Sequence, residues 1–174
     1  MDSKERRKAI LETLKKSKSP IKGTDLADKF DVSRQVIVQD IAILRAGGTE
    51  ILATPQGYMI IGAEKNDKIR KTIVCKHCGY DEIEDELKTI IDMGGKLLDV
   101  IVEHPIYGEI KSPLMLNSRI EIEEFMKKIK KKDAQPLSSL TGGIHLHTVE
   151  VSSEEVFKKI EERLNQKGYL VDSR

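Results

Sequence analysis

The sequence has no tryptophan, only two cysteines among its 174 residues and an aromatic content of 4%. So few cysteines argue against the disulfide framework of a small secreted domain and favour a reducing compartment. No apolar run approaches the roughly 20 residues that a membrane helix needs. The polar segment 1–7 also lacks the apolar stretch of a signal peptide. We therefore expect a cytoplasmic protein with no membrane partner.

Neither sign of charge prevails, since 30 basic residues stand against 29 acidic ones and the formal net charge is +1. Such a balance excludes no class of partner, because a local basic face for nucleic acid can lie within a neutral total. A hydrophobic content of 39% with 34% charged residues is ordinary for a globular protein and too mixed for a disordered one. The length suits one large domain or two small ones.

The first sixty residues carry a helix-turn-helix pattern. Apolar positions at helical spacing predict a helix over 4–16 and a second, short helix from Thr24, as its N-cap, to Phe30. Ser33 is expected to be the N-cap of a third helix, which begins directly after it. The short junction between the second and third helices is typical of the helix-turn-helix motif. The inner face of the third helix is predicted to comprise Val36, Ile37, Ile41 and Leu44.

The outer face of this third helix offers side chains suited to reading DNA. The predicted DNA-binding residues are Ser33, Arg34, Gln35, Gln39 and Arg45. An arginine can make a paired contact with guanine and a glutamine with adenine, while a serine hydroxyl can bind phosphate. The alternative is a three-helix interaction module without a DNA role, which would show no salt-sensitive binding to any duplex.

Two short strands over 50–54 and 58–61, joined by Pro55-Gln56-Gly57, predict a β-hairpin after the third helix. Over residues 4–61 the sequence resembles the winged helix-turn-helix domains of bacterial regulators, in which such a hairpin forms the wing. The motifs that carry this resemblance are DVSRQVIVQDIAILR and ILATPQGYMI. The polar, glycine-bearing segment 62–67 is typical of a linker. We therefore expect a DNA-binding domain over 1–64 and a second domain over 65–174.

Beyond the linker, strand and helix patterns alternate. The expected strands are 72–76, 96–102, 107–114, 144–151 and 169–171, and the expected helices are 82–93, 118–132 and 153–166. Ser118 with Glu121, and Ser152 with Glu155, have the spacing of capping boxes at two helix starts. The fold class is therefore α+β, with an α/β sandwich of mainly antiparallel sheet whose helices cover one face. The polar loop 133–143 is long enough to indicate a functional segment.

Two of the four histidines, His145 and His147, stand one residue apart in a predicted strand. Because residues i and i+2 point to the same face of a strand, both imidazoles project side by side. Together with His77 and one carboxylate they would suit zinc, nickel or iron. Periodicity does not choose among the acidic residues of 82–86. The alternative is that both histidines are surface residues on one sheet face.

Residues 70–172 resemble the three-histidine domain that follows a winged helix in a family of bacterial transcription regulators. The motifs are KH at 76–77, DVIVEHPIYGEI at 99–110 and GGIHLHT at 142–148. This family includes the niacin-responsive repressors of NAD biosynthesis and niacin uptake genes. The resemblance implies a homodimeric repressor of operator DNA, with nicotinic acid as co-repressor and a bound divalent transition metal (nickel or zinc, or else iron).

Carried over by motif, the metal ligands would be His77, Glu86, His145 and His147. Glu86 is less firmly placed, because the segment from Cys78 to Glu82 is one residue longer than the family pattern. Cys75 and Cys78 have the C-x-x-C spacing of soft-metal or redox pairs. If this segment is a strand, Cys75 shares a face with His77, so cysteine ligation stays open.

His104 and Tyr107, in the turn between two predicted strands, are the candidate effector-binding residues. His104 could instead be a turn residue hydrogen-bonded to the backbone. The resemblance favours a repressor that senses a small carboxylate, and not an enzyme. Two other readings are a regulator that senses the metal itself and, from another class, a metal hydrolase fused to a DNA-binding module. The hydrolase reading lacks a separate general base, a phosphate loop or a nucleophile elbow.

Overall fold

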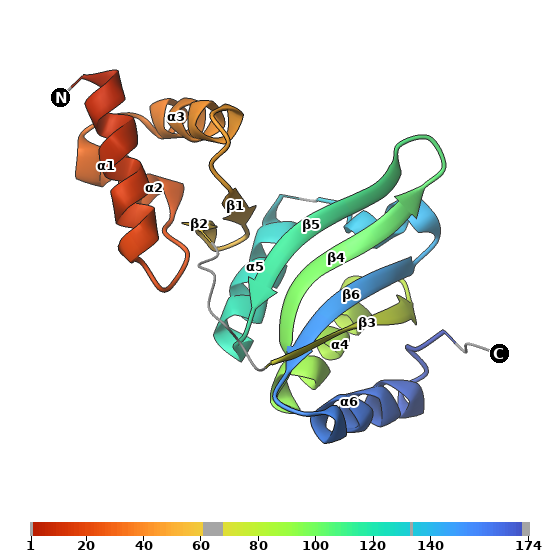
Figure 1. Ribbon diagram of the computed structural model, residues 1–174. Coiled ribbons are helices and arrows are strands. Elements are labelled where there is room, and N and C mark those ends of the chain that lie inside the picture. The colour runs from red at the N-terminus through yellow and green to blue at the C-terminus, as the bar shows by residue number, and fades with distance from the viewer. Residues whose placement is uncertain (1, 61–67, 133, 172–174) are drawn as a thin grey trace. The chain divides into compact units, whose positions relative to one another are not determined.

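The computed structural model describes residues 2–60, 68–132 and 134–171 (Figure 1). The chain divides into two compact units, Met1–Lys65 and Asn66–Arg174, which are described separately below. Within the described residues, no helix combines the length and apolar character needed to cross a bilayer.

The N-terminal unit consists of three helices and a two-stranded hairpin. Its elements are α1 (Ser3–Lys16), α2 (Gly23–Phe30), α3 (Arg34–Ala46), β1 (Ile51–Thr54) and β2 (Gly57–Ile60). The two strands pair antiparallel across a tight turn. All five elements contribute to one core. Its buried residues are Ile10, Leu14, Leu26, Ala27, Ile37, Ile41 and Ile51, and Tyr58 and Ile60 of β2 pack against them. The expected winged helix-turn-helix is confirmed.

The junction between α2 and α3 is short, as expected. Ser33 caps α3, because its hydroxyl accepts a hydrogen bond from the backbone N–H of Val36 at 3.4 Å. Asp31 ends α2 in the left-handed conformation at φ 50°, which aspartate tolerates better than most residues.

The prediction that Thr24 caps α2 is wrong. The helix begins at Gly23, Lys22 is its N-cap, and no side chain caps it. The reason is a long-range contact, since Ile21 forms a bridge with Tyr58 of the wing and the chain stays extended up to Lys22. Gly57 allows this approach, because a Cβ there would lie 2.2 Å from the Ile21 carbonyl oxygen.

The C-terminal unit is an α+β sandwich. In chain order its elements are β3 (Ile69–Lys76), α4 (Tyr80–Asp92), β4 (Lys96–His104), β5 (Gly108–Leu116), α5 (Arg119–Lys131), the 3-10 helix η1 (Leu137–Thr141), β6 (Ile144–Val151) and α6 (Glu154–Gln166). The strands form one antiparallel sheet in the order β3-β6-β4-β5. The predicted fold class is therefore confirmed.

The helices α4, α5 and α6 pack against one face of this sheet (Figure 1). All three contribute to a single core with the strands, including Leu87 and Ile90 from α4, Ile122 and Met126 from α5, and Phe157, Ile160 and Leu164 from α6. On β6, Val149 and Val151 belong to this core. Because side chains alternate along a strand, His145 and His147 face the same helix layer.

Several predicted details of this unit need correction. The capping box at Ser118 and Glu121 is confirmed, but the one at Ser152 and Glu155 is wrong. Strand β6 stays paired as far as Val151, so α6 begins later and Ser153 caps it. The predicted strand 169–171 is reduced to an isolated bridge between Leu170 and Cys75.

Candidate functional site

Strand β6 presents two buried imidazoles to the helix layer. His145 and His147 are each 3% exposed, and their ring centroids lie 5.0 Å apart. The expectation that both point to one face is met by the alternating burial along β6.

Glu86, in the middle of α4, is fully buried opposite these rings. Three histidine Nε2 atoms approach its Oε2: that of His77, just beyond β3, at 2.6 Å, that of His145 at 3.1 Å and that of His147 at 3.7 Å. The four residues predicted as metal ligands therefore come together around one carboxylate oxygen.

Backbone carbonyls fix how two of these rings are turned. The Nδ1–H of His145 donates to the carbonyl of Gly143 at 2.8 Å, and the Nδ1–H of His147 donates to that of Asp99 at 2.7 Å. Such bonds commonly orient a metal-binding histidine. They leave Nε2 of each neutral ring with its lone pair toward the carboxylate. Two electron-rich groups in this position require a cation, either a proton or a metal ion, between them.

Two buried polar atoms of the cluster have no hydrogen-bond partner among the described residues, namely Glu86 Oε1 and His77 Nδ1. A buried carboxylate oxygen without a partner is costly unless a cation satisfies it. The donor set of three imidazoles and a carboxylate matches the preferences of zinc, nickel and iron. The residues present therefore fit a divalent transition metal.

The cluster also shifts its own protonation equilibria. Burial by itself raises the pKa of Glu86, but attraction to His147 and hydrogen bonds from His145 and His77 hold it well below its usual range. Burial opposes protonation of His145, yet the hydrogen bond to Glu86 and its charge raise the pKa of the imidazole. The carboxylate is therefore charged, and it favours positive charge on its neighbours.

Gly143 brings the end of β3 against the start of β6. Its φ is +94°, and a Cβ there would lie 2.6 Å from the carbonyl oxygen of His77 and 2.8 Å from Cys78 Sγ. Its N–H donates to the carbonyl of Ser138 in η1, within the loop that the sequence indicated as functional. Any side chain at this position would push His77 away from His145. From the sequence, this glycine was noted only as part of the GGIHLHT motif and the end of the polar loop.

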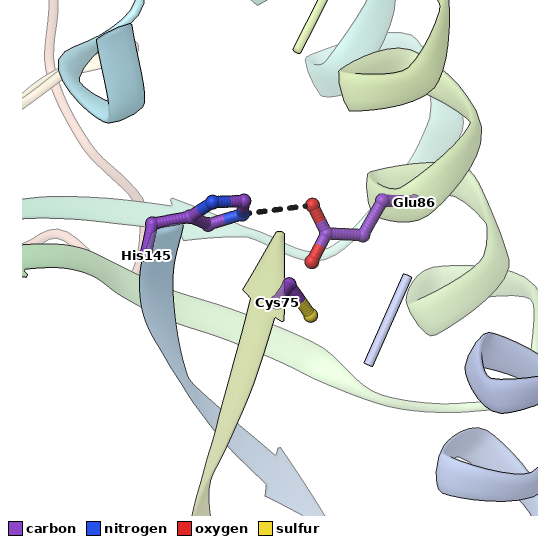
Figure 2. A group of neighbouring side chains, drawn as sticks. All are labelled: Cys75, Glu86 and His145. Atoms are coloured by element: carbon purple, nitrogen blue, oxygen red, sulfur yellow. Dashed lines mark hydrogen bonds and ion pairs between the residues drawn. The ribbon is translucent and has the colours of Figure 1, made fainter. Parts of the chain in front are cut away.

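The two cysteines lie in different surroundings. Cys75 is fully buried and faces Glu86 and His145, as Figure 2 shows, whereas Cys78 is exposed. Burial, and then the charge of Glu86, raise the pKa of the Cys75 thiol. The expectation that Cys75 shares a face with His77 is consistent with the burial of both.

His104 and Tyr107 lie at the turn between β4 and β5. The Nδ1 of His104 accepts hydrogen bonds from the backbone N–H groups of Ile106 and Tyr107 at 3.2 and 3.3 Å, as expected for a turn residue. The side chain of Tyr107 is 77% exposed. His104 stands four residues along β4 from Val100, which pairs with His147, so it projects toward the same sheet face. A role in effector binding stays a prediction.

In the N-terminal unit, four of the predicted DNA-binding residues lie on α3 and are exposed, namely Arg34, Gln35, Gln39 and Arg45. Ser33 is also exposed, although its hydroxyl is used as the helix cap. Arg45 has a structural contact, because its Nε donates to the carbonyl of Ile51 at 2.7 Å and so joins α3 to the wing.

A buried ion pair that sequence reasoning missed connects α1 to α3. Asp40 is 2% exposed on the inner face of α3. Its carboxylate accepts hydrogen bonds from Arg6 Nε at 2.6 Å and Arg7 at 3.4 Å. The signal was present, since Asp40 lies three residues after Ile37 and so falls on the apolar face of the helix. This carboxylate fixes the helix that carries the predicted DNA contacts.

The sequence matches two domain families and two full-length relatives. Residues 6–59 match a helix-turn-helix domain, and residues 70–173 match the 3H domain. The chain is 42% identical over 168 residues to the probable transcription repressor NiaR of Thermotoga maritima, an alignment that covers 97% of this chain and 94% of that protein. It is 41% identical over 168 residues to the transcription repressor NadR of Bacillus subtilis, and this alignment covers 95% of this chain and 93% of NadR.

One relative is a transcription repressor and the other a probable one, in agreement with the predicted regulatory role. The matches extend across both structural units, and they place the helix-turn-helix and the three-histidine cluster in domains of known families. The chain belongs to the family of NiaR- and NadR-type transcription repressors, in which a helix-turn-helix domain precedes a 3H domain.

Proposed function

We propose that this repressor binds operator DNA in response to nicotinic acid and regulates genes of NAD biosynthesis or niacin uptake. The observation that carries the proposal is the cluster of His77, Glu86, His145 and His147 inside a 3H domain, on a chain that also has a helix-turn-helix domain. The choice of nicotinic acid as the effector rests on the resemblance to niacin-responsive repressors.

DNA recognition would use the exposed face of α3. Arg34, Gln35 and Gln39 project from its first two turns, where a recognition helix meets base edges in the major groove. Ser33 would contact phosphate, and Arg45 would support the wing through its bond to the Ile51 carbonyl. A homodimer would present two such helices to palindromic half-sites.

The metal site would be held by the four clustered residues. A divalent ion there, nickel, zinc or iron, would supply positive charge to the buried Glu86 carboxylate in place of a proton shared with the imidazoles. His145 and His147 would bind through Nε2, because their Nδ1–H groups are already donated to backbone carbonyls.

Nicotinate is a planar anion with a ring nitrogen, so its site needs a positive charge and flat or apolar walls. The metal centre would provide the charge. His104 and Tyr107, whose rings lie 5.0 Å apart, would provide a wall at the β4–β5 turn. For nicotinate to act as co-repressor, it must bind more tightly to the arrangement that fits the operator, because a ligand shifts an equilibrium only through differential affinity.

The proposal is tested by titrating the metal-loaded protein into a labelled niacin-gene operator, with and without nicotinic acid. Nicotinamide is the matched control, since it keeps the pyridine ring but replaces the carboxylate by a neutral amide. We expect nicotinic acid to lower the Kd for the operator and nicotinamide to leave it unchanged. An operator affinity that ignores nicotinic acid would contradict the proposal.

The same titration distinguishes this proposal from the alternative that the protein is a regulator for which the metal itself is the signal. In that case chelation would abolish operator binding, metal would restore it, and nicotinic acid would have no effect in either state. The hydrolase reading receives no support from the relatives, which are repressors.

A further inference from the structure

The buried thiol of Cys75 lies directly beside the candidate metal centre. Cys75 on β3 pairs with His145 on β6 in the antiparallel register, so their side chains are cross-strand neighbours on the face toward the helices. Cys75 is fully buried, and the polar histidine cluster lies next to it.

The ligating atoms of three residues are grouped closely. Cys75 Sγ, one carboxylate oxygen of Glu86 and one ring nitrogen of His145 all lie within 4.8 Å of one another. In Figure 2 the carboxylate lies between the imidazole and the thiol. Ligands of one tetrahedral zinc ion stand roughly 3.3 to 3.8 Å apart, given bonds of about 2.0 Å to nitrogen and 2.3 Å to sulfur. A contraction of roughly one ångström would therefore bring all three within bonding distance of an ion.

The second oxygen of Glu86 provides an independent indication. Oε2 is surrounded by histidines, whereas Oε1 is buried and has no hydrogen-bond partner among the described residues. The Glu86 side chain is only 1% exposed, so water does not readily satisfy this oxygen. A cation bound between Oε1 and the Cys75 thiol would satisfy this oxygen.

We propose that Cys75 is a ligand of the metal centre, alongside Glu86 and His145, so that this chain holds its ion with a thiolate as well as imidazoles. Binding forms a sulfur–metal bond and releases the thiol proton to the buffer. A thiolate favours softer ions, which makes zinc a better occupant than manganese or magnesium. The inference rests on the proposed metal site and deepens it.

The test uses cobalt(II) as a spectroscopic probe, added in equimolar amount to the metal-free full-length chain without oxygen. Thiolate ligation gives an intense sulfur-to-cobalt charge-transfer band in the near ultraviolet, whereas imidazole and carboxylate ligands give only weak visible bands. We expect the charge-transfer band in the unmodified chain and in Cys78→Ser, and its loss in Cys75→Ser. Cys78→Ser is the matched control, because that cysteine is exposed and only three residues away.

Cys75→Ala provides a second variant, since alanine keeps the position apolar if serine disturbs the core. Circular dichroism checks its fold, and competition with a chelator should show zinc affinity reduced at least ~10-fold. Visible cobalt bands without a charge-transfer band, or unchanged zinc affinity in a folded Cys75→Ala, would overturn cysteine ligation and leave the histidine site standing. Absence of any cobalt binding would overturn both.

Discussion

The buried carboxylate of Asp40 allows a direct test of how α3, the predicted DNA-reading helix, is held in place. We consider Asp40→Asn, which keeps the size of the side chain and one acceptor oxygen but removes the charge. Asp40 is 2% exposed, and the side chains of Arg6 and Arg7 are 12% and 25% exposed. The substitution therefore leaves two largely buried guanidinium groups without their counter-charge.

The magnitude follows from this geometry. Removing one partner of a fully buried ion pair costs roughly 3–5 kcal/mol, because the remaining charge is uncompensated. Asparagine still accepts a hydrogen bond and both arginines reach some water, so we expect about 2–3 kcal/mol. Since 1.4 kcal/mol corresponds to a factor of ten, local opening should become roughly 30 to 150 times more frequent.

Amide hydrogen exchange of α1 and α3 in the full-length chain measures this directly, because it reports the opening of each unit separately. The matched control is Asp28→Asn, which removes the same charge from an exposed position on α2. Exchange in α1 and α3 should accelerate strongly in Asp40→Asn and little in Asp28→Asn. An equal, small effect in both variants would refute the view that Asp40 fixes α3 to α1.

Three further perturbations test the fold and the proposed metal site. Gly143→Ala should weaken zinc binding at least ~10-fold in chelator competition, because its Cβ would meet the carbonyl of His77. Gly142→Ala is the control, since Gly142 also has a positive φ of +61° but open space around its Cβ position. An equal loss of zinc affinity in both variants would contradict the prediction. Zinc affinity measured by calorimetry should fall as the pH is lowered through the pKa of His145, which Glu86 raises despite burial, and a flat profile would be inconsistent with imidazole ligation. Gly57→Ala should lower the Tm of the N-terminal unit, since its Cβ would lie 2.2 Å from the Ile21 carbonyl oxygen; a Tm unchanged by this substitution would count against the close approach.

Local patterns predicted much of the fold. The alternation of β6 placed His145 and His147 on one face, and the serine caps at Ser33 and Ser118 follow from side chains within three residues of the helix start. The predictions failed where a contact between residues far apart in the sequence determined the local structure. Thr24 lost its predicted cap because the pairing of Ile21 with Tyr58 keeps the chain extended up to the helix start.

The candidate site was predicted in its residue types but not in its complete surroundings. Family motifs brought Glu86 and three histidines together, and the structure places them around one oxygen. The neighbourhood of Cys75 and His145 depends on the register between β3 and β6, which no local pattern determines. The place of Asp40 on the apolar face of α3 could be predicted from helical spacing, but its partners could not, because they are 33 and 34 positions away.

Glu86 and His145 belong to different layers of the sandwich and are 59 positions apart in the chain. An ion bound to both would close a long loop, much as a disulfide does, and for a loop of this length the loss of chain entropy in the unfolded state is worth about 4 kcal/mol. Unlike a disulfide, that closure would be made and undone by the supply of metal. If the proposed metal site holds, the lifetime of the folded C-terminal unit in the cell would then follow metal availability, whatever the concentration of the proposed effector.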